Sequence, residues 1–163
     1  RDVLGSRGLG DVYKRQDNDN QVIDPHSIEY LGYDENRQKE LLSRHFRIMA
    51  EAVASGLFTF LAHLDYMRRV KICTAEMFWE EKTAVIKALA EKGMPVELST
   101  KGLTKSSEMF PARKILQELK RYNIPVVISD DAHETQRLGA DFKAAETLLK
   151  QLNYANRWKM HQE

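Results

Sequence analysis

The sequence predicts an α/β fold in which helices alternate with buried parallel strands. One pattern occurs three times: an amphipathic helix ends at a stop residue and is followed by a short apolar run that ends in polar residues, called here the polar tip. The stop residues are Gly56, Gly93 and Asn123. The apolar runs are nearly continuous, which is typical of strands that are covered on both faces of a parallel sheet. Right-handed crossovers would then bring all the strand tips to the same edge.

The first two units occupy the first two thirds of the chain. An amphipathic helix is predicted over 36–55, because its apolar residues recur at steps of three and four. A strand over 57–62 follows it. In the second unit, Thr74 is a candidate N-cap for a helix that ends at Gly93, and the next strand is expected over 95–99.

The third unit carries the strand with the most unusual ending. Pro111 lies near a predicted helix start, where its missing N–H costs little. The strand over 125–128 follows and stops abruptly in acidic and imidazole side chains. A last helix runs from Phe142 to about Leu152, and 154–160 is a candidate terminal edge strand.

The composition is that of an ordinary globular domain. The chain has 163 residues, of which 42% are hydrophobic and 30% charged, and this is enough for one domain with a moderate core. The single cysteine, Cys73, excludes an internal disulfide framework and a cysteine-rich zinc site. No apolar run approaches the length of a membrane span and no signal-peptide pattern is visible, so we expect a cytoplasmic protein without a membrane partner.

Residues 1–16 are expected to lie outside the domain. The run over 6–16 resembles the in-frame translation of a transposase sequencing adapter, and a disordered leader is the alternative. Setting 1–16 aside removes four of the 25 basic and two of the 24 acidic residues, which leaves 21 and 22. We therefore predict a partial domain over 17–163, from a gene that continues upstream, with no nucleic-acid footprint.

Side chains that can ligate metals follow the predicted strands. His63 follows the first strand, Glu97 lies in the second, and the third ends in the run over 129–133. In extended geometry, Asp131 and His133 would leave the backbone on one side. A carboxylate and imidazoles that converge there suit a divalent metal such as Zn, Mn or Fe. The alternative is an aspartate that caps a turn beside a surface histidine.

These motifs together resemble the polymerase-and-histidinol-phosphatase (PHP) superfamily, and they are most similar to its histidinol-phosphate phosphatases. The resemblance covers roughly residues 40–155. It rests on Gly56-Leu57-Phe58, Ala62-His63-Leu64-Asp65, Val96-Glu97-Leu98-Ser99-Thr100-Lys101-Gly102-Leu103 and Ser129-Asp130-Asp131-Ala132-His133. It implies the carboxyl-terminal portion of a distorted (βα)7 barrel with two or three metal ions at its rim.

The resemblance also implies roles for individual residues. His63, Asp131 and His133 match metal ligands of the family. Glu97 matches a glutamate that orients the ligands, although a carboxylate paired with a lysine or arginine is the alternative. Asp130 replaces a residue that is usually small, which places an extra acid near the metals.

Other positions depart from the family pattern. Thr104 stands where an arginine is common, so Lys101 and Lys105 are the candidates for binding phosphate, with solvated surface lysines as the alternative. The His-x-His motif of the family would lie upstream of residue 17. The chain would then carry only part of the ligand set.

For the full-length protein, the resemblance implies metal-assisted hydrolysis of a small phosphate monoester, histidinol phosphate, in histidine biosynthesis. We expect this chain by itself to be almost inactive. One alternative is a PHP nuclease or polymerase-associated domain, which the near-neutral charge and the lack of basic–aromatic interleaving disfavour. Another is a non-enzymatic α/β module that binds a metal or a partner.

Overall fold

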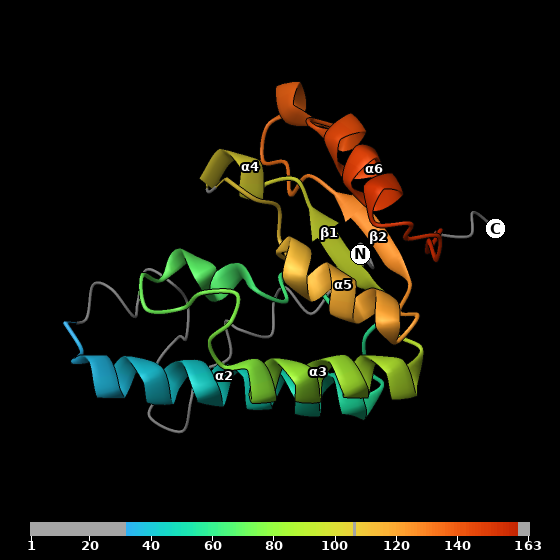
Figure 1. The fold of residues 1–163 in the computed structure, drawn as a ribbon. Helices are drawn as coiled ribbons and strands as arrows, with labels where there is room; N and C mark the ends of the chain where they lie inside the picture. Colours follow the sequence, from blue (N-terminus) through green and yellow to red (C-terminus); the bar gives the residue numbers. More distant parts are fainter. Residues whose placement is uncertain (1–31, 106, 160–163) are drawn as a thin grey trace, which may run out of the picture.

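The computed structural model describes residues 32–105 and 107–159. Within them lie α2 (Glu35–Ser55), η2 (Tyr66–Arg69), α3 (Trp79–Lys92), β1 (Val96–Ser99), α4 (Gly102–Lys105), α5 (Arg113–Arg121), β2 (Val126–Ser129), η3 (Thr135–Arg137) and α6 (Phe142–Gln151) (Figure 1). The fold is mixed α/β with a parallel sheet, as predicted. These elements do not show a seven-stranded barrel, which remains a prediction. The predictions for 1–16 and for the start of a domain at 17 lie outside the described residues.

A small parallel sheet carries the polar tips. β1 and β2 pair in parallel from Val96↔Val126 to Ser99↔Ser129. Single parallel bridges extend this arrangement on both sides, from Leu61 to Val96 and from Arg157 to Val126. Four chain segments therefore run in the same direction, and the residues that follow them emerge at one edge.

The two outer segments are shorter than the sequence predicts. The expected strand over 57–62 pairs only at Leu61 among the described residues, and Leu57 is 81% exposed. The expected edge strand over 154–160 likewise pairs only at Arg157, and residue 160 lies outside the described residues. A segment forms a strand only where successive residues pair with a neighbouring strand, and each of these segments forms a single described bridge.

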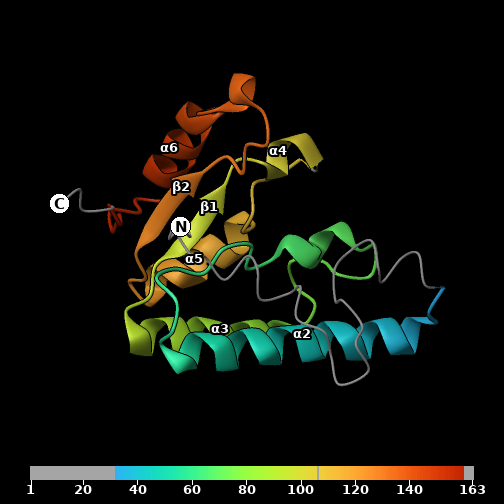
Figure 2. The same ribbon diagram turned by 180° about the vertical axis from the view of Figure 1, so that it is seen from behind.

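The helices surround this sheet unevenly. α2 and α3 lie side by side along one side of the molecule, whereas α4, α5 and α6 gather around the sheet (Figures 1 and 2). α2 begins after Asp34, whose carboxylate accepts a hydrogen bond from the backbone N–H of Arg37 at 2.9 Å. It ends at Gly56, which adopts a φ of 70° as a helix-terminating glycine commonly does.

The start of α3 differs from the prediction. The helix begins at Trp79 after Phe78, so Thr74 is not its N-cap. The Thr74 hydroxyl instead accepts a hydrogen bond from the N–H of Met77 at 3.3 Å, within the preceding turn. Phe78 takes a φ of 56° and its ring packs 6.0 Å from that of Phe46. Core packing of an aromatic ring therefore sets this helix start.

A buried ion pair fixes the segment that follows His63. Asp65 is fully buried, and its Oδ2 accepts hydrogen bonds from Arg68 Nε at 2.7 Å and from the N–H of Ala112 at 2.8 Å. Arg68 also donates to the carbonyl of Met109 at 2.7 Å. Burial raises the pKa of Asp65, although the charge of Arg68 opposes this shift. These contacts join the turn after His63 to the segment that leads into α5.

Among the described residues, no helix is both long enough and apolar enough to span a lipid bilayer.

We expect Gly102→Ala to destabilise the fold by about 3 kcal/mol, because it inserts a methyl group where backbone atoms already lie. A Cβ at this position would be 2.3 Å from the carbonyl oxygen of Glu108 and 2.6 Å from Met109 Cα. Gly56→Ala is the matched control, since its Cβ would meet no atom within 4 Å and only the positive φ would cost about 1 kcal/mol. Urea denaturation measures both losses, and equal losses would contradict the packing argument.

Candidate functional site

The carboxylate of Glu97, in β1, connects its own strand to the segment that ends at His63 and to the end of β2. Its Oε2 accepts two hydrogen bonds from His63, one from the backbone N–H at 2.9 Å and one from ring Nδ1 at 2.8 Å. Its Oε1 accepts a short hydrogen bond from the hydroxyl of Ser129 at the end of β2. Only 7% of the Glu97 side chain is exposed, so these protein groups replace most of its hydration. The side chain of Glu97 therefore pairs with His63, as the predicted orienting role requires. The alternative was a pair with a lysine or arginine.

The pair formed by His63 and Glu97 favours the charged form of each side chain. Burial alone would lower the pKa of His63, but the hydrogen bond and negative charge of Glu97 outweigh it and raise that pKa. Burial would raise the pKa of Glu97, but its hydrogen bond to His63, the charge of His63 and the hydroxyl of Ser129 lower it. Because a carboxylate only accepts hydrogen bonds, the contact assigns a proton to Nδ1 of His63 and places the lone pair of the neutral ring on Nε2.

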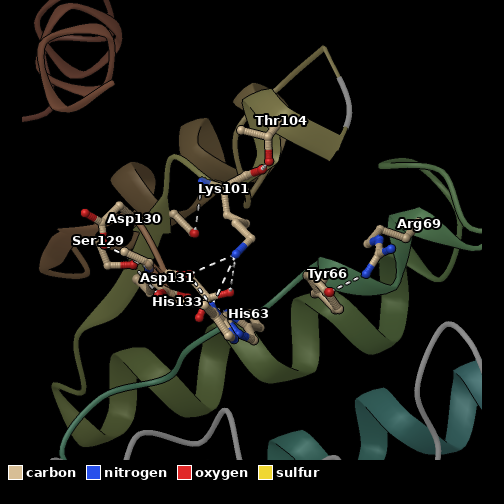
Figure 3. Close-up of polar contacts among 12 residues, drawn as sticks. His63, Tyr66, Arg69, Lys101, Thr104, Ser129, Asp130, Asp131 and His133 are labelled. Atoms are coloured by element: carbon tan, nitrogen blue, oxygen red, sulfur yellow. Dashed lines mark hydrogen bonds and ion pairs between the residues drawn. The ribbon is translucent and has the colours of Figure 1, made fainter. Parts of the chain in front are cut away.

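Tyr66 was missed by the sequence analysis. Its ring stacks on that of His63, with centroids 5.1 Å apart and planes inclined by 25°. Arg69 lies over the Tyr66 ring at 5.1 Å and donates a short hydrogen bond to its hydroxyl (Figure 3). These residues lie in the short η2 helix, which the sequence analysis did not predict. The aromatic side chain three residues after His63 was the available signal.

A second cluster lies at the end of β2, where Lys101 reaches across from the end of β1 (Figure 3). Lys101 Nζ donates to the carbonyl oxygen of Asp131 at 2.9 Å and lies 3.8 Å from the carboxylate Oδ2 of the same residue. It is also 3.4 Å from Nδ1 of His133. That Nδ1 is 2.8 Å from the carbonyl oxygen of Asp131, an acceptor, which assigns the proton to Nδ1.

The backbone after β2 departs from the extended geometry expected from the sequence. β2 ends at Ser129 and Asp131 has a φ of 47°, in the left-handed region. The alternation of side chains therefore stops before Asp131, so the expectation of extended geometry over 131–133 is wrong, although both side chains approach the ammonium group of Lys101. The turn, rather than strand alternation, brings the carbonyl of Asp131 to the ring of His133.

The other predicted residues have different surroundings. Asp130 accepts hydrogen bonds at its carboxylate from the N–H of Ala132 at 3.1 Å and from the N–H of Gly139, so it stabilises the turn after β2. The side chain of Lys105 lies outside the described part of the structure. The hydroxyl of Thr104 donates to the carbonyl of Lys101 at 2.9 Å.

An open hollow of about 220 Å³ adjoins this cluster. It is lined by Ala132, His133, Glu134, Thr135 and Leu138. His133 is exposed and lines this hollow, and its Nδ1 lies 3.4 Å from the ammonium group of Lys101.

The predicted ligands carry nitrogen and oxygen atoms that suit a metal ion, but they are not grouped around a point where an ion would sit. His63 Nδ1 is held by a carboxylate and His133 Nδ1 by a carbonyl, as is usual for histidines that ligate metals through Nε2. Within 32–105 and 107–159, however, no three histidine, cysteine or acidic side chains are grouped closely enough to hold an ion. The cation beside Asp131 is the ammonium group of Lys101.

Comparison with curated proteins shows a distant similarity. No protein-family profile matches the chain. It is 24% identical over 132 residues to a protein of Deinococcus radiodurans named probable histidinol-phosphatase. The match covers 73% of this chain and 50% of that protein, so the chain spans half the length of this relative. The similarity hints at a PHP-like relationship.

We expect Glu97→Gln to lower the free energy of unfolding by about 1–3 kcal/mol in the presence of a chelator, most strongly between about pH 4.5 and 6.5. The folded pKa of His63 is raised above 6.5, so its contribution is complete below that value and disappears as the pH rises through the folded pKa. The folded pKa of Glu97 is lowered below 4.5, so its contribution is present above that value and disappears as the pH falls.

Denaturant titrations from pH 4 to 9 measure this dependence. Glu91→Gln, at an exposed position of α3, is the matched control and should change stability little at any pH. A loss for Glu97→Gln that is the same across the whole range would contradict the charged pairing of Glu97 with His63.

Proposed function

We propose that this chain is part of a metal-dependent phosphomonoester hydrolase whose substrate is histidinol phosphate. The observation that carries the proposal is that the imidazoles of His63 and His133, the carboxylate of Asp131 and the ammonium group of Lys101 lie together at one edge of a parallel sheet (Figure 3). The edge beyond the carboxyl ends of the strands is where α/β folds commonly bind ligands. The relative named probable histidinol-phosphatase supports the reaction class and the substrate.

The residues of this chain would hold and orient the reacting groups. His63 and Asp131, together with His133, would be ligands through Nε2 and carboxylate oxygens, and further ligands would come from outside the described residues. A bound divalent metal such as Zn, Mn or Fe would activate water and neutralise charge on the phosphate. Glu97 fixes the ring of His63 by accepting its Nδ1–H.

The anionic substrate needs a cation from the protein as well. Lys101 is the natural group to contact the phosphate, because its ammonium already lies beside Asp131 and His133. A lysine binds phosphate as a point charge, so it would orient the phosphate less strictly than the bidentate arginine that Thr104 replaces. An open hollow lies beside His133, next to this ammonium group.

Two other functions remain as alternatives. A nuclease or polymerase-associated domain would act on phosphodiesters, and a non-enzymatic module would bind metal without turnover. A biosynthetic phosphatase would act in the cytoplasm on a small molecule, without nucleic-acid or membrane partners. The family resemblance implies further ligands beyond those of this chain, so we expect little turnover by the 163-residue chain itself.

We expect the protein encoded by the complete reading frame to hydrolyse histidinol phosphate in a metal-dependent manner and to leave an oligonucleotide intact. Asp131→Ala and His133→Ala should each lower kcat/KM at least about 100-fold, whereas Glu97→Gln should lower it about 10- to 100-fold because it acts through His63. Phosphate release measures all three effects.

Lys87→Met, at an exposed position of α3, is the control and should retain full activity. Cleavage of the oligonucleotide in preference to histidinol phosphate would favour the nuclease. Metal binding that depends on Asp131 without any phosphatase turnover would favour the non-enzymatic module.

A further inference from the structure

The backbone of His63 has an unusual conformation. Its φ of 57° lies in the left-handed region, which residues other than glycine rarely occupy. Such a conformation persists where the surrounding contacts hold it in place. The N–H of His63 donates to Oε2 of Glu97 at 2.9 Å, and its carbonyl accepts a hydrogen bond from the N–H of Tyr66 at 3.1 Å. The backbone of His63 is therefore held by β1 on one side and by the start of η2 on the other.

The ring of His63 is held by two contacts that restrict different motions. Its Nδ1 donates to Oε2 of Glu97 at 2.8 Å, and this contact is at the edge of the ring. Hydrogen bonds tolerate a range of angles, so a ring held at one nitrogen alone can still tilt about that nitrogen. Tyr66 instead covers a face of the ring, with centroids 5.1 Å apart and planes inclined by 25°. The stacked ring therefore blocks the tilt that the hydrogen bond leaves open.

Tyr66 is itself held from several directions. Its ring packs edge-on against the buried ring of Phe110, with centroids 5.5 Å apart. Its hydroxyl accepts a short hydrogen bond from Arg69, whose guanidinium lies 5.1 Å from the centre of the Tyr66 ring (Figure 3). Within the described part of the chain, Tyr66 is the one side chain to which that of Arg69 donates a hydrogen bond. Met67, between them, is buried and anchors η2 to the core.

We propose that Tyr66 is a positioning residue that holds the plane of the His63 ring, and that Arg69 acts on this ring through the hydroxyl of Tyr66. Glu97 selects the ring nitrogen that carries the proton, and Tyr66 keeps the ring aligned with Glu97. The lone pair on Nε2 then has a fixed direction before any ligand binds. The use of that lone pair by a ligand rests on the proposed function, whereas the alignment of the ring does not.

The tautomer of His63 tests the role of the stacked ring. Nitrogen-15 NMR spectra of the 163-residue chain, recorded without metal at a pH where the ring is neutral, report which ring nitrogen carries the proton. The Nδ1–H form should predominate in the unaltered chain. Tyr66→Leu should raise the ratio of the Nε2–H form to the Nδ1–H form about two- to tenfold, which is the effect of losing one aromatic stack. Tyr122→Leu, at the partly exposed end of α5, is the control and should leave the ratio unchanged.

Two milder substitutions test the role of Arg69. Tyr66→Phe keeps the stacked ring and removes the hydroxyl, and Arg69→Met removes the guanidinium. Each should raise the ratio by less than Tyr66→Leu does, and the double variant should match Arg69→Met alone because both changes remove the same hydrogen bond. Arg121→Met, at a position whose side chain is 77% exposed, is the control and should have no effect. Fully independent effects of Tyr66→Phe and Arg69→Met would overturn the action of Arg69 through Tyr66.

An unchanged ratio in Tyr66→Leu, or in both milder variants if Tyr66→Leu does not fold, would overturn the positioning role. Circular dichroism checks that each variant is folded, and the ratio is read from signals of the folded protein, so a loss of stability alone does not alter it. The measurement uses neither metal nor turnover. An inactive protein with the expected ratios would therefore support the positioning role and count against the proposed function, and an active phosphatase with unchanged ratios would do the reverse.

Discussion

The arrangement of the candidate site depends on the buried carboxylate of Glu97. This group lies in β1 and accepts hydrogen bonds from the backbone and ring of His63 and from the hydroxyl of Ser129. A carboxylate that is 7% exposed is stable only when protein donors replace its hydration. The requirement to satisfy Glu97 therefore fixes the position of His63 relative to the ends of β1 and β2.

The elements that the sequence predicts well are those with local signals at both ends. α2 and the strands β1 and β2 lie within one or two residues of their predicted bounds, and Gly56, Gly93 and Asn123 all adopt the positive φ expected of stop residues. The outer strands could not be predicted in the same way, because a strand exists only if a neighbour pairs with it. Leu61 and Arg157 show this, since each forms one bridge.

The topology predicts which residues lie together at the edge of the sheet. The contacts that these residues make could not be predicted. Parallel strands bring His63 and Glu97 to one edge, and the hydrogen bonds between them confirm that proximity. The sequence did not predict that Asp131 would adopt a left-handed φ, or that Lys101 would turn inward toward it. Both depend on how loops pack against one another, and this information is absent from local periodicity.

The two carboxylates of the site differ in a way that suits different tasks. Glu97 is buried and satisfied by groups that belong to the strands and to the turn at His63, so exchanging its partners would disrupt the fold. Asp131 is more exposed, at 29%, and its carboxylate lies 3.8 Å from the ammonium group of Lys101, so solvent and small ligands can reach it. The histidine ring that Glu97 holds is therefore oriented before any ligand arrives.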